Sequence, residues 1–179
     1  MKKSLILFLI VASLYNKSNA QTCNVADNIH QLSSNAVTVN SSNLGQSFKA
    51  SCNGTIKSIR VWTNKVTQNI NGVLRVYNGT FSGFAQNLNL PILHTQNFSW
   101  NKSSSTVMHT IELSKPISVV SGNDYMFMLH GTNENNSAFL YQNNKQTYTG
   151  GELKEKDGDF WFSDTDDDLK FQVNYTDVI

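Results

Sequence analysis

Short runs in which apolar and polar residues alternate recur along the chain, and they predict β-strands. The last run is the clearest, because Leu169, Phe171, Val173 and Tyr175 point to one side and the residues between them to the other. Residues 55–63, 106–113 and 125–130 alternate in the same way. No window keeps a helical period with capping residues at its ends. The pattern therefore predicts an all-β chain.

Turn signals separate these runs at short intervals. The pairs Asn53-Gly54, Asn71-Gly72, Asn78-Gly79 and Gly150-Gly151 supply the positive φ angles that tight hairpins need. The strands expected between the turns include 46–50, 73–77, 92–98, 115–120 and 137–142. Many short strands with regular turns are typical of an all-β sandwich or barrel.

The segment 157–175 is expected to organise the fold. An aromatic strand, residues 160–162, is followed by a tight acidic loop and then by the alternating strand 169–175. We expect the rest of the chain to pack against these two strands, with the acidic oxygens gathered at one tip.

The first twenty residues have the features of a signal peptide. Met1-Lys2-Lys3 is a basic start, residues 5–14 form an apolar run too short to cross a bilayer, and Ser18-Asn19-Ala20 offers a cleavage site. No later stretch has membrane length, so we expect no membrane insertion. The prediction is one β-sandwich domain, residues 21–179, secreted, periplasmic or at the cell surface of a bacterium.

The charge of the exported part argues against two classes of partner. Three of the 14 basic residues, Lys2, Lys3 and Lys17, lie in the leader, so 11 remain against 13 acidic residues. A net charge of about −2 does not suit binding to nucleic acid or to an anionic membrane surface.

The exported part contains two cysteines, Cys23 and Cys52, and we expect a disulfide between them. Such a bridge contributes roughly 3 kcal/mol in the chain-entropy model. The alternative is a pair of buried thiols.

Three groups of residues carry a resemblance to a family. They are residues 45–50 (GQSFKA) followed by 52–59, residues 116–125, and residues 148–151 together with 168–173. The chain resembles the jelly-roll modules of secreted Bacteroidetes proteins, which are similar to carbohydrate-binding jelly rolls. The resemblance implies an antiparallel β-sandwich of jelly-roll topology and a non-catalytic binding role. It is more specific for the fold than for the function.

The acidic loop is the candidate metal site. Asp164, Asp166 and Asp168 stand at alternate positions, and carboxylates so close repel one another unless water or a cation lies between them. Ca²⁺ binds six to eight oxygens and suits such a loop. The resemblance implies a structural calcium near the last strand, with Asp168 in a suitable place. The alternative is a solvated turn whose charges prevent edge-to-edge pairing.

Sugar binding would need exposed aromatic rings, and Trp62, Trp100 and Tyr148 are the candidates. Trp62 lies opposite Ile59 and Val61 in the alternation, which places it outside, and Trp100 stands in a polar stretch. The alternative for each ring is burial, because a sandwich of this size buries most of its large aromatic side chains.

Signals of catalysis are weak. No serine stands in a nucleophile-elbow motif, the four histidines have no metal-binding spacing, and Glu112 and Glu152 are the default candidates for paired carboxylates. We therefore expect no enzymatic activity. The sequence predicts a secreted carbohydrate-binding module whose partner is an extracellular polysaccharide. The alternative is a structural or adhesive surface protein, for which the sign would be an exposed apolar patch or strand edge.

Overall fold

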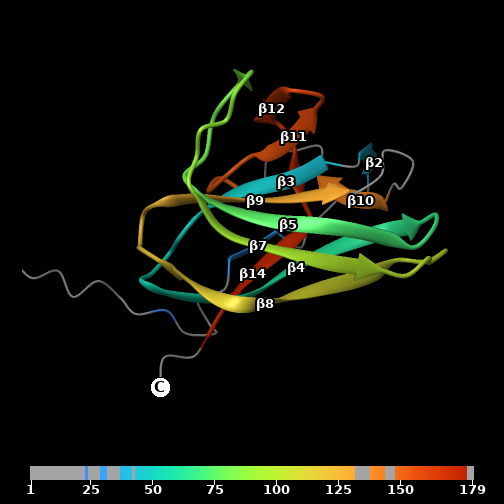
Figure 1. Cartoon of the computed structure of the whole chain (residues 1–179), viewed down its shortest axis with the longest axis horizontal. Helices are drawn as coiled ribbons and strands as arrows, with labels where there is room; N and C mark the ends of the chain where they lie inside the picture. The colour runs from blue at the N-terminus through green and yellow to red at the C-terminus, as the bar shows by residue number, and fades with distance from the viewer. Residues whose placement is uncertain are drawn as a thin grey trace, which may run out of the picture.

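Two stacked antiparallel sheets make up the fold (Figure 1). The computed structural model describes Cys23 and residues 29–31, 37–41, 43–131, 138–143 and 148–176. None of these residues is helical. The predicted signal peptide lies outside the described residues. The expected all-β antiparallel sandwich is confirmed.

The first sheet is organised around β4 (Gly54–Val66), which has neighbours on both sides. β4 pairs with β8 on one side and with β14 and then β10 on the other. The remaining members of this sheet are β1 (Ile29–Gln31), β2 (Val37–Ser41), β8 (Val107–Val119), β10 (Ala138–Asn143), β13 (Asp168–Leu169) and β14 (Phe171–Tyr175).

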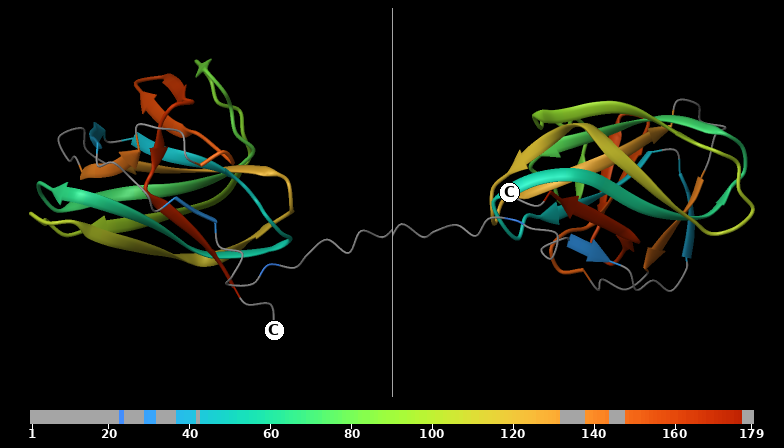
Figure 2. Two further views of the ribbon diagram at one scale, coloured as in Figure 1. Left: turned by 180° about the vertical axis from the view of Figure 1, so that it is seen from behind. Right: turned by 90° about the horizontal axis from the view of Figure 1, so that it is seen from below.

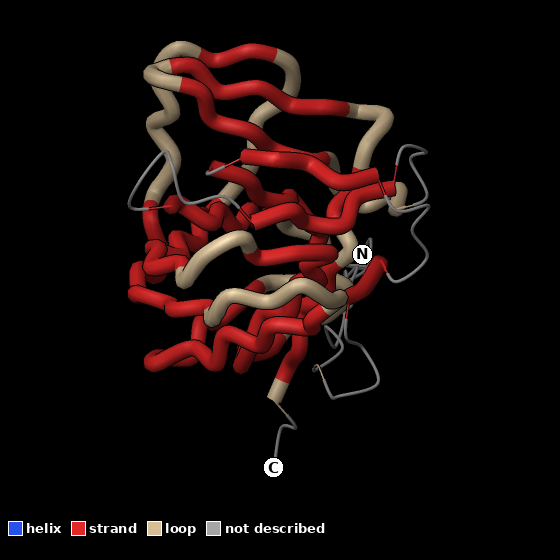
Figure 3. The backbone as a smooth tube through the Cα atoms, turned by 90° about the vertical axis from the view of Figure 1, so that its right-hand side faces the viewer, coloured by secondary structure: helices blue, strands red, loops and turns tan. Residues whose placement is uncertain are grey.

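The second sheet has the strand order β6-β12-β11-β3-β9-β5-β7. Its strands are β6 (Phe84–Ala85), β12 (Phe160–Asp164), β11 (Leu153–Asp157), β3 (Asn43–Lys49), β9 (Asp124–Gly131), β5 (Ile70–Asn78) and β7 (Ile92–Trp100). Figure 3 shows the strands of the two sheets in their layers from the side.

The chain crosses repeatedly between the sheets, as in a jelly roll. It passes from β3 to β4 and back to β5, and from β7 through β8, β9 and β10 to β11, changing sheet at each step. The two further views in Figure 2 show these crossings at the ends of the sandwich. Neighbouring strands in a sheet are therefore mostly distant in sequence, which agrees with the jelly-roll prediction.

The main core lies between the sheets, and the last strand contributes to it as its alternation predicts. Leu169, Phe171, Val173 and Tyr175 are each no more than 2% exposed. Phe171 packs against Phe127 of β9 in the opposite sheet, with ring centroids 5.9 Å apart. Burial of these apolar side chains is the main driving force for stacking the two sheets.

The aromatic strand and the last strand do not pair with each other. β12 belongs to the second sheet and pairs with β11 and β6, whereas β14 belongs to the first sheet and pairs with β1 and β4. The acidic loop between them therefore carries the chain from one sheet to the other.

The expected turn at Asn71-Gly72 is wrong, because both residues lie inside β5. A Cβ atom at Gly72 would stand 2.4 Å from the Phe98 ring and 2.7 Å from the carbonyl oxygen of His130. Glycine is needed here for close packing rather than for a turn.

A second, smaller core lies on the outer face of the second sheet. It is formed by Tyr77, Met126, Met128 and Trp161, and it is covered by apolar side chains of residues 79–91, which we name the cover segment. The Trp161 ring meets the rings of Tyr77 and Phe81 edge-on, at 6.3 and 6.1 Å between centroids. Since Trp161 is on β12 and Tyr77 on β5, the second sheet curls so that these distant strands approach each other. In Figure 1, the cover segment and the β11–β12 hairpin rise on the same side of the sheet.

No helix in the described part of the chain is long and apolar enough to cross a membrane.

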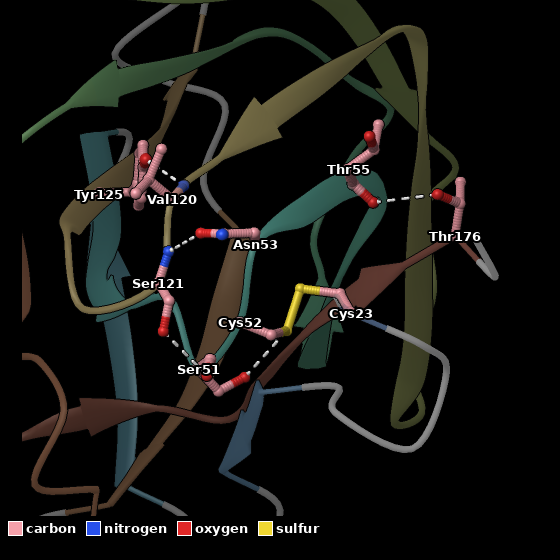
Figure 4. Close-up of a disulfide and its surroundings, with 9 residues drawn as sticks. All are labelled: Cys23, Ser51, Cys52, Asn53, Thr55, Val120, Ser121, Tyr125 and Thr176. Carbon is pink, nitrogen blue, oxygen red and sulfur yellow. Dashed lines mark hydrogen bonds between the residues drawn. A yellow bond between two sulfur atoms is a disulfide. The ribbon is translucent and has the colours of Figure 1, made fainter. Parts of the chain in front are cut away.

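The predicted disulfide is confirmed, since Cys23 and Cys52 are bonded to each other (Figure 4). The Cys23 amide also donates to the Asn53 carbonyl oxygen at 2.6 Å. Asn53 Oδ1 accepts from the amide of Ser121, which ties the start of β4 to the β8–β9 turn. The bridge thus fixes Cys23 to the segment that leads into β4.

Replacing both cysteines, as Cys23→Ser with Cys52→Ser, should lower the free energy of unfolding by roughly 3 kcal/mol, because the unfolded chain regains the freedom of a closed loop. Denaturant titration with and without reductant measures this. Reductant should weaken the native chain to the level of the variant and leave the variant unchanged. An equal response of both proteins to reductant would contradict the bridge.

Candidate functional site

The three aromatic residues expected to bind sugar lie in three separate places. Trp62 is on β4 of the first sheet, Trp100 ends β7 of the second sheet, and Tyr148 precedes β11. Trp62 is partly exposed, as expected, but the ammonium group of Lys170 lies over its ring at 5.5 Å. The structure therefore does not bring the three rings together on one surface.

The expectation that Trp100 is an exposed ring is wrong, because only 6% of its surface is accessible. β7 continues through Trp100 instead of ending at Phe98, so both residues face inward. The Trp100 ring lies 4.7 Å from the Phe98 ring and stacks on His109 at 4.3 Å. A ring packed on both sides in this way is not available for stacking on a sugar.

Tyr148 packs against the main core and contacts the turn at Gly150-Gly151. Its ring meets Phe171 edge-on at 5.3 Å, and its hydroxyl oxygen accepts the amide hydrogen of Lys49. Burial raises the pKa of the phenol strongly, so Tyr148 stays protonated. We assign Tyr148 to holding the turn at Gly150-Gly151 rather than to contact with a ligand.

The acidic loop has one buried member and two exposed ones. Asp164 and Asp166 are exposed, whereas Asp168 has no accessible surface. The Asp168 carboxylate accepts hydrogen bonds from Gln46 Nε2 at 2.9 Å and from the Tyr148 amide at 3.0 Å. Gln46 Oε1 in turn accepts the Leu169 amide hydrogen at 2.8 Å. Asp168 therefore serves as an interior link between the sheets.

Among the described residues, no group of three or more His, Cys, Asp or Glu side chains is placed to hold a metal ion. Asp164 Oδ1 accepts the amide hydrogen of Asp166, which stabilises the bend by itself. Calcium binding at this loop stays a prediction. Thermal melts with calcium and with EDTA test it, because a ligand of the folded state must raise the melting temperature.

A polar pocket of about 280 Å³ lies beside the cover segment, on the outer face of the second sheet. Its lining is rich in hydroxyl groups, carboxylates and glycine backbone, and consists of Ser47, Lys49, Thr80, Ser82, Asp124, Thr149, Gly150, Gly151 and Glu152. These residues come from three parts of the chain: the adjacent strands β3 and β9, the cover segment and the turn before β11. We name this cavity the polar pocket.

The walls of the polar pocket are fixed by close backbone packing. A Cβ atom at Gly151 would stand 1.8 Å from the carbonyl oxygen of Ser47, so only glycine allows this approach. The Ser47 hydroxyl accepts the Glu152 amide hydrogen at 2.8 Å. Lys49 and Asp124 also line the pocket, and Lys49 Nζ forms an ion pair with Asp124 Oδ1 at 2.7 Å. Contacts between the protein's own groups therefore fix the shape of the pocket.

A fully buried lysine joins the hairpin to the cover segment. Lys154 Nζ contacts Glu152 Oε2 at 2.8 Å, donates to Ser163 Oγ at 2.6 Å and donates to the carbonyl oxygen of Phe81. The same ammonium group lies over the Phe81 ring at 4.7 Å. The Ser163 hydroxyl also donates to Glu152. A charged group without accessible surface is stable only because all of these partners surround it.

The charges of Lys154 and Glu152 suit a structural role. Burial lowers the pKa of Lys154, and the Glu152 carboxylate opposes this shift. Burial raises the pKa of Glu152, but hydrogen bonds from Lys154 and Ser163 outweigh it and the pKa is lowered. Lys154 is therefore held as an ammonium ion and Glu152 as a carboxylate. The negative charge of Glu152 favours the protonated form of Lys154.

The two carboxylates considered for a catalytic pair do not face each other. Glu152 lines the polar pocket, whereas Glu112 lines a separate groove of about 360 Å³ between the edge strands β7 and β8. Burial lowers the pKa of His109 in that groove to about 4. His109 is therefore neutral at physiological pH, and this partly buried side chain is hydrogen-bonded to Thr63 Oγ1 at 2.9 Å.

Three exposed phenylalanines form a cluster that the sequence did not reveal. Phe84, Phe160 and Phe162 are 59%, 41% and 40% exposed. The Phe84 ring lies 5.3 Å from that of Phe160 and 5.5 Å from that of Phe162. Alternation places Phe160 and Phe162 opposite to Trp161, but it does not say which side is buried. The curl of the sheet places Trp161 on the covered side of β12, and Phe160 and Phe162 are therefore left exposed.

Comparison with solved structures supports the fold. The chain is similar to two structures of Cwp84, a surface layer associated protein of Clostridium difficile: one of its cysteine protease and lectin-like domains, and one of the protease after propeptide cleavage. Sequence identity is 11% in both cases, with TM-scores of 0.55 and 0.54. The match covers 84% of this chain but only 36% and 41% of those chains. No protein-family model and no curated protein sequence matches the chain.

Replacing Lys154 with methionine should lower the free energy of unfolding by about 3 kcal/mol, because Glu152 and the Phe81 carbonyl lose a buried charged partner. The matched control is Lys156→Met on the same face of β11, where the side chain is partly exposed and the loss should stay below about 1 kcal/mol.

Denaturant titration compares these two variants. Adding Glu152→Gln to Lys154→Met should recover part of the loss, since the unpaired carboxylate is then removed. Equal stability of the two lysine variants would show that the buried ammonium group does not hold the hairpin to the cover segment.

Proposed function

We propose that the chain is a non-catalytic extracellular binding module and that its polar pocket binds a carbohydrate. The observation that carries the proposal is the lining of the pocket, which offers the hydroxyl groups and carboxylates of Ser47, Thr80, Ser82, Thr149, Asp124 and Glu152. Similarity in fold to chains that include a lectin-like domain supports the same class of function. The disulfide and the surface-layer association of the similar protein support an extracellular location.

The chemistry of the pocket matches the needs of a sugar. A sugar ring presents several hydroxyl groups, each of which donates and accepts hydrogen bonds. Carboxylates such as Asp124 accept such bonds strongly, and the hydroxyls of Ser82 and Thr149 can do both. Asp124 is already paired with Lys49, so a ligand hydroxyl would meet both partners of an ion pair.

The size and shape of the pocket favour a single sugar unit. Its volume of about 280 Å³ lies near the lower end of the range for small-molecule sites. Because its walls are fixed by Gly151 and Ser47, binding requires little ordering of the protein. The aromatic stacking expected at Trp62, Trp100 and Tyr148 has no part in this proposal, since those rings are covered or buried.

A second candidate function, adhesion through protein–protein contact, is favoured by one specific observation. The cluster of Phe84, Phe160 and Phe162 is an exposed apolar patch, which in soluble proteins marks an interaction site. It lies on a different surface from the polar pocket, and the two functions are therefore compatible.

A glycan array probed with the mature chain tests the carbohydrate proposal, with calorimetry on any polysaccharide fragment that binds. Asp124→Asn removes a charged acceptor from the pocket and should weaken binding by roughly ten- to a hundredfold. Asp157→Asn, an exposed carboxylate on β11 outside the pocket, is the matched control and should leave the affinity unchanged.

Because Asp124 and Lys49 are both exposed, Asp124→Asn should cost little stability, and melting curves check this. Absence of binding across the array would contradict the proposal. An equal loss of glycan affinity in Asp124→Asn and Asp157→Asn would contradict it too.

A further inference from the structure

The three exposed phenylalanines lie on the interior face of the second sheet, at a place that the first sheet does not cover. The registers show this directly. Leu153 pairs with the core residue Gln46, and Glu155 pairs with the core residue Leu44, so both point to the interior side. Across β12, Glu155 pairs with Phe162 and Asp157 pairs with Phe160 on that same side. Phe84 of β6 pairs with Phe162 and completes the face.

This face is exposed because the second sheet extends beyond the first and curls away from it. Trp161, which points to the other side of β12, is held in the outer core against Tyr77. The phenylalanines are therefore turned outward, and in Figure 1 the hairpin lies at the top of the molecule with β4 and β8 at the bottom. A face of this chemistry is normally covered by a second layer. We name it the aromatic face: Phe84, Phe160 and Phe162 with Glu155, Asp157 and Asp164.

Charge on the hairpin is divided between its two sides. The carboxylates of Glu155, Asp157 and Asp164 lie on the aromatic face, since they alternate with or pair across from the phenylalanines. The lysines of the hairpin, Lys154 and Lys156, lie on the other side, where Lys154 is buried and Lys156 lies over the Trp161 ring. Burial raises the pKa of Glu155, and the charges of Asp164, Asp167 and Asp157 raise it further. The carboxylates thus repel one another in the absence of a cation.

We propose that the aromatic face is a docking surface for a basic, apolar segment of a partner protein, in which Arg or Lys side chains meet the carboxylates and apolar side chains cover the phenyl rings. Cations attract both carboxylates and the faces of aromatic rings, so the two halves of the surface select the same partner. This inference rests on the proposed adhesion function and is independent of sugar binding at the polar pocket.

The arrangement of the rings favours a protein segment over a sugar. The Phe84 ring is inclined by 28° to that of Phe160 and by 64° to that of Phe162, so the three rings do not form one flat platform. Phenylalanine also lacks the hydrogen-bonding group that tyrosine and tryptophan offer to a sugar hydroxyl. An uneven apolar surface suits branched side chains, which fill the gaps between rings.

Short synthetic peptides of equal length test the proposal. One alternates arginine with leucine, one serine with leucine and one glutamate with leucine, and fluorescence anisotropy measures their binding to the mature chain. The arginine peptide should bind best, and its binding should weaken as salt is added. Phe84→Ser with Phe160→Ser and Phe162→Ser should weaken it at least about tenfold. Asp157→Asn with Asp164→Asn should weaken it and reduce the salt dependence.

The matched control is Ile92→Ser with Val120→Ser, which removes two apolar side chains, each 54% exposed, outside the aromatic face. It should bind the arginine peptide as the native chain does. Melting curves and circular dichroism check that every variant is folded. The salt dependence of arginine-peptide binding to the native chain tests the role of charge without any substitution.

Four outcomes would overturn the proposal. One is equal binding of the arginine and serine peptides, and another is no binding of any peptide. A third is a concentration-dependent dimer, seen by sedimentation, that the phenylalanine variant abolishes, because the occupant would then be a second copy of the chain. The fourth is a loss of glycan binding in that variant, which would assign the face to sugars. Loss of glycan binding in Asp124→Asn alone concerns only the polar pocket.

Discussion

The buried ammonium group of Lys154 and the buried ring of Trp161 on the neighbouring strand together set the shape of the second sheet. Both point to the outer side of the β11–β12 hairpin, and both contact Phe81 of the cover segment. A lysine without accessible surface requires its partners to stay in place, since an unpaired charge in the interior is very costly. The hairpin is therefore held against the cover segment, and the sheet curls toward its outer face.

Both candidate surfaces follow from this curl. On the outer side, it brings the cover segment over β3 and the turn at Gly150-Gly151, which forms the polar pocket. On the opposite side, it lifts Phe84, Phe160 and Phe162 away from the first sheet and leaves them exposed. One structural cause thus gives a polar cavity and an apolar surface on the two sides of the same hairpin. A variant that releases the hairpin should affect both, whereas surface variants separate them.

The sequence predicts the fold class and much of the main core, but it predicts little of the sites. Alternation identifies the inward residues of β14 because one face is apolar and the other polar. It fails at β12, where both sides carry apolar residues, because it cannot tell which of two apolar sides is covered. Asp168 shows a second limit: its sequence neighbours suggest an exposed loop, whereas hydrogen bonds from the distant Gln46 and Tyr148 make a buried carboxylate stable. Gly72 shows a third, since a turn signal can serve close packing instead.

Residue-level labelling of the native chain by hydroxyl radicals, read by mass spectrometry, tests the central claim most directly. The claim is that β12 presents its phenylalanines to solvent and keeps its tryptophan inside. Phe84, Phe160 and Phe162 should then be labelled readily, whereas Trp161 should be protected to the same degree as Trp100 of the main core. Protection of the three phenylalanines in the monomeric chain, with rapid labelling of Trp161, would contradict the account.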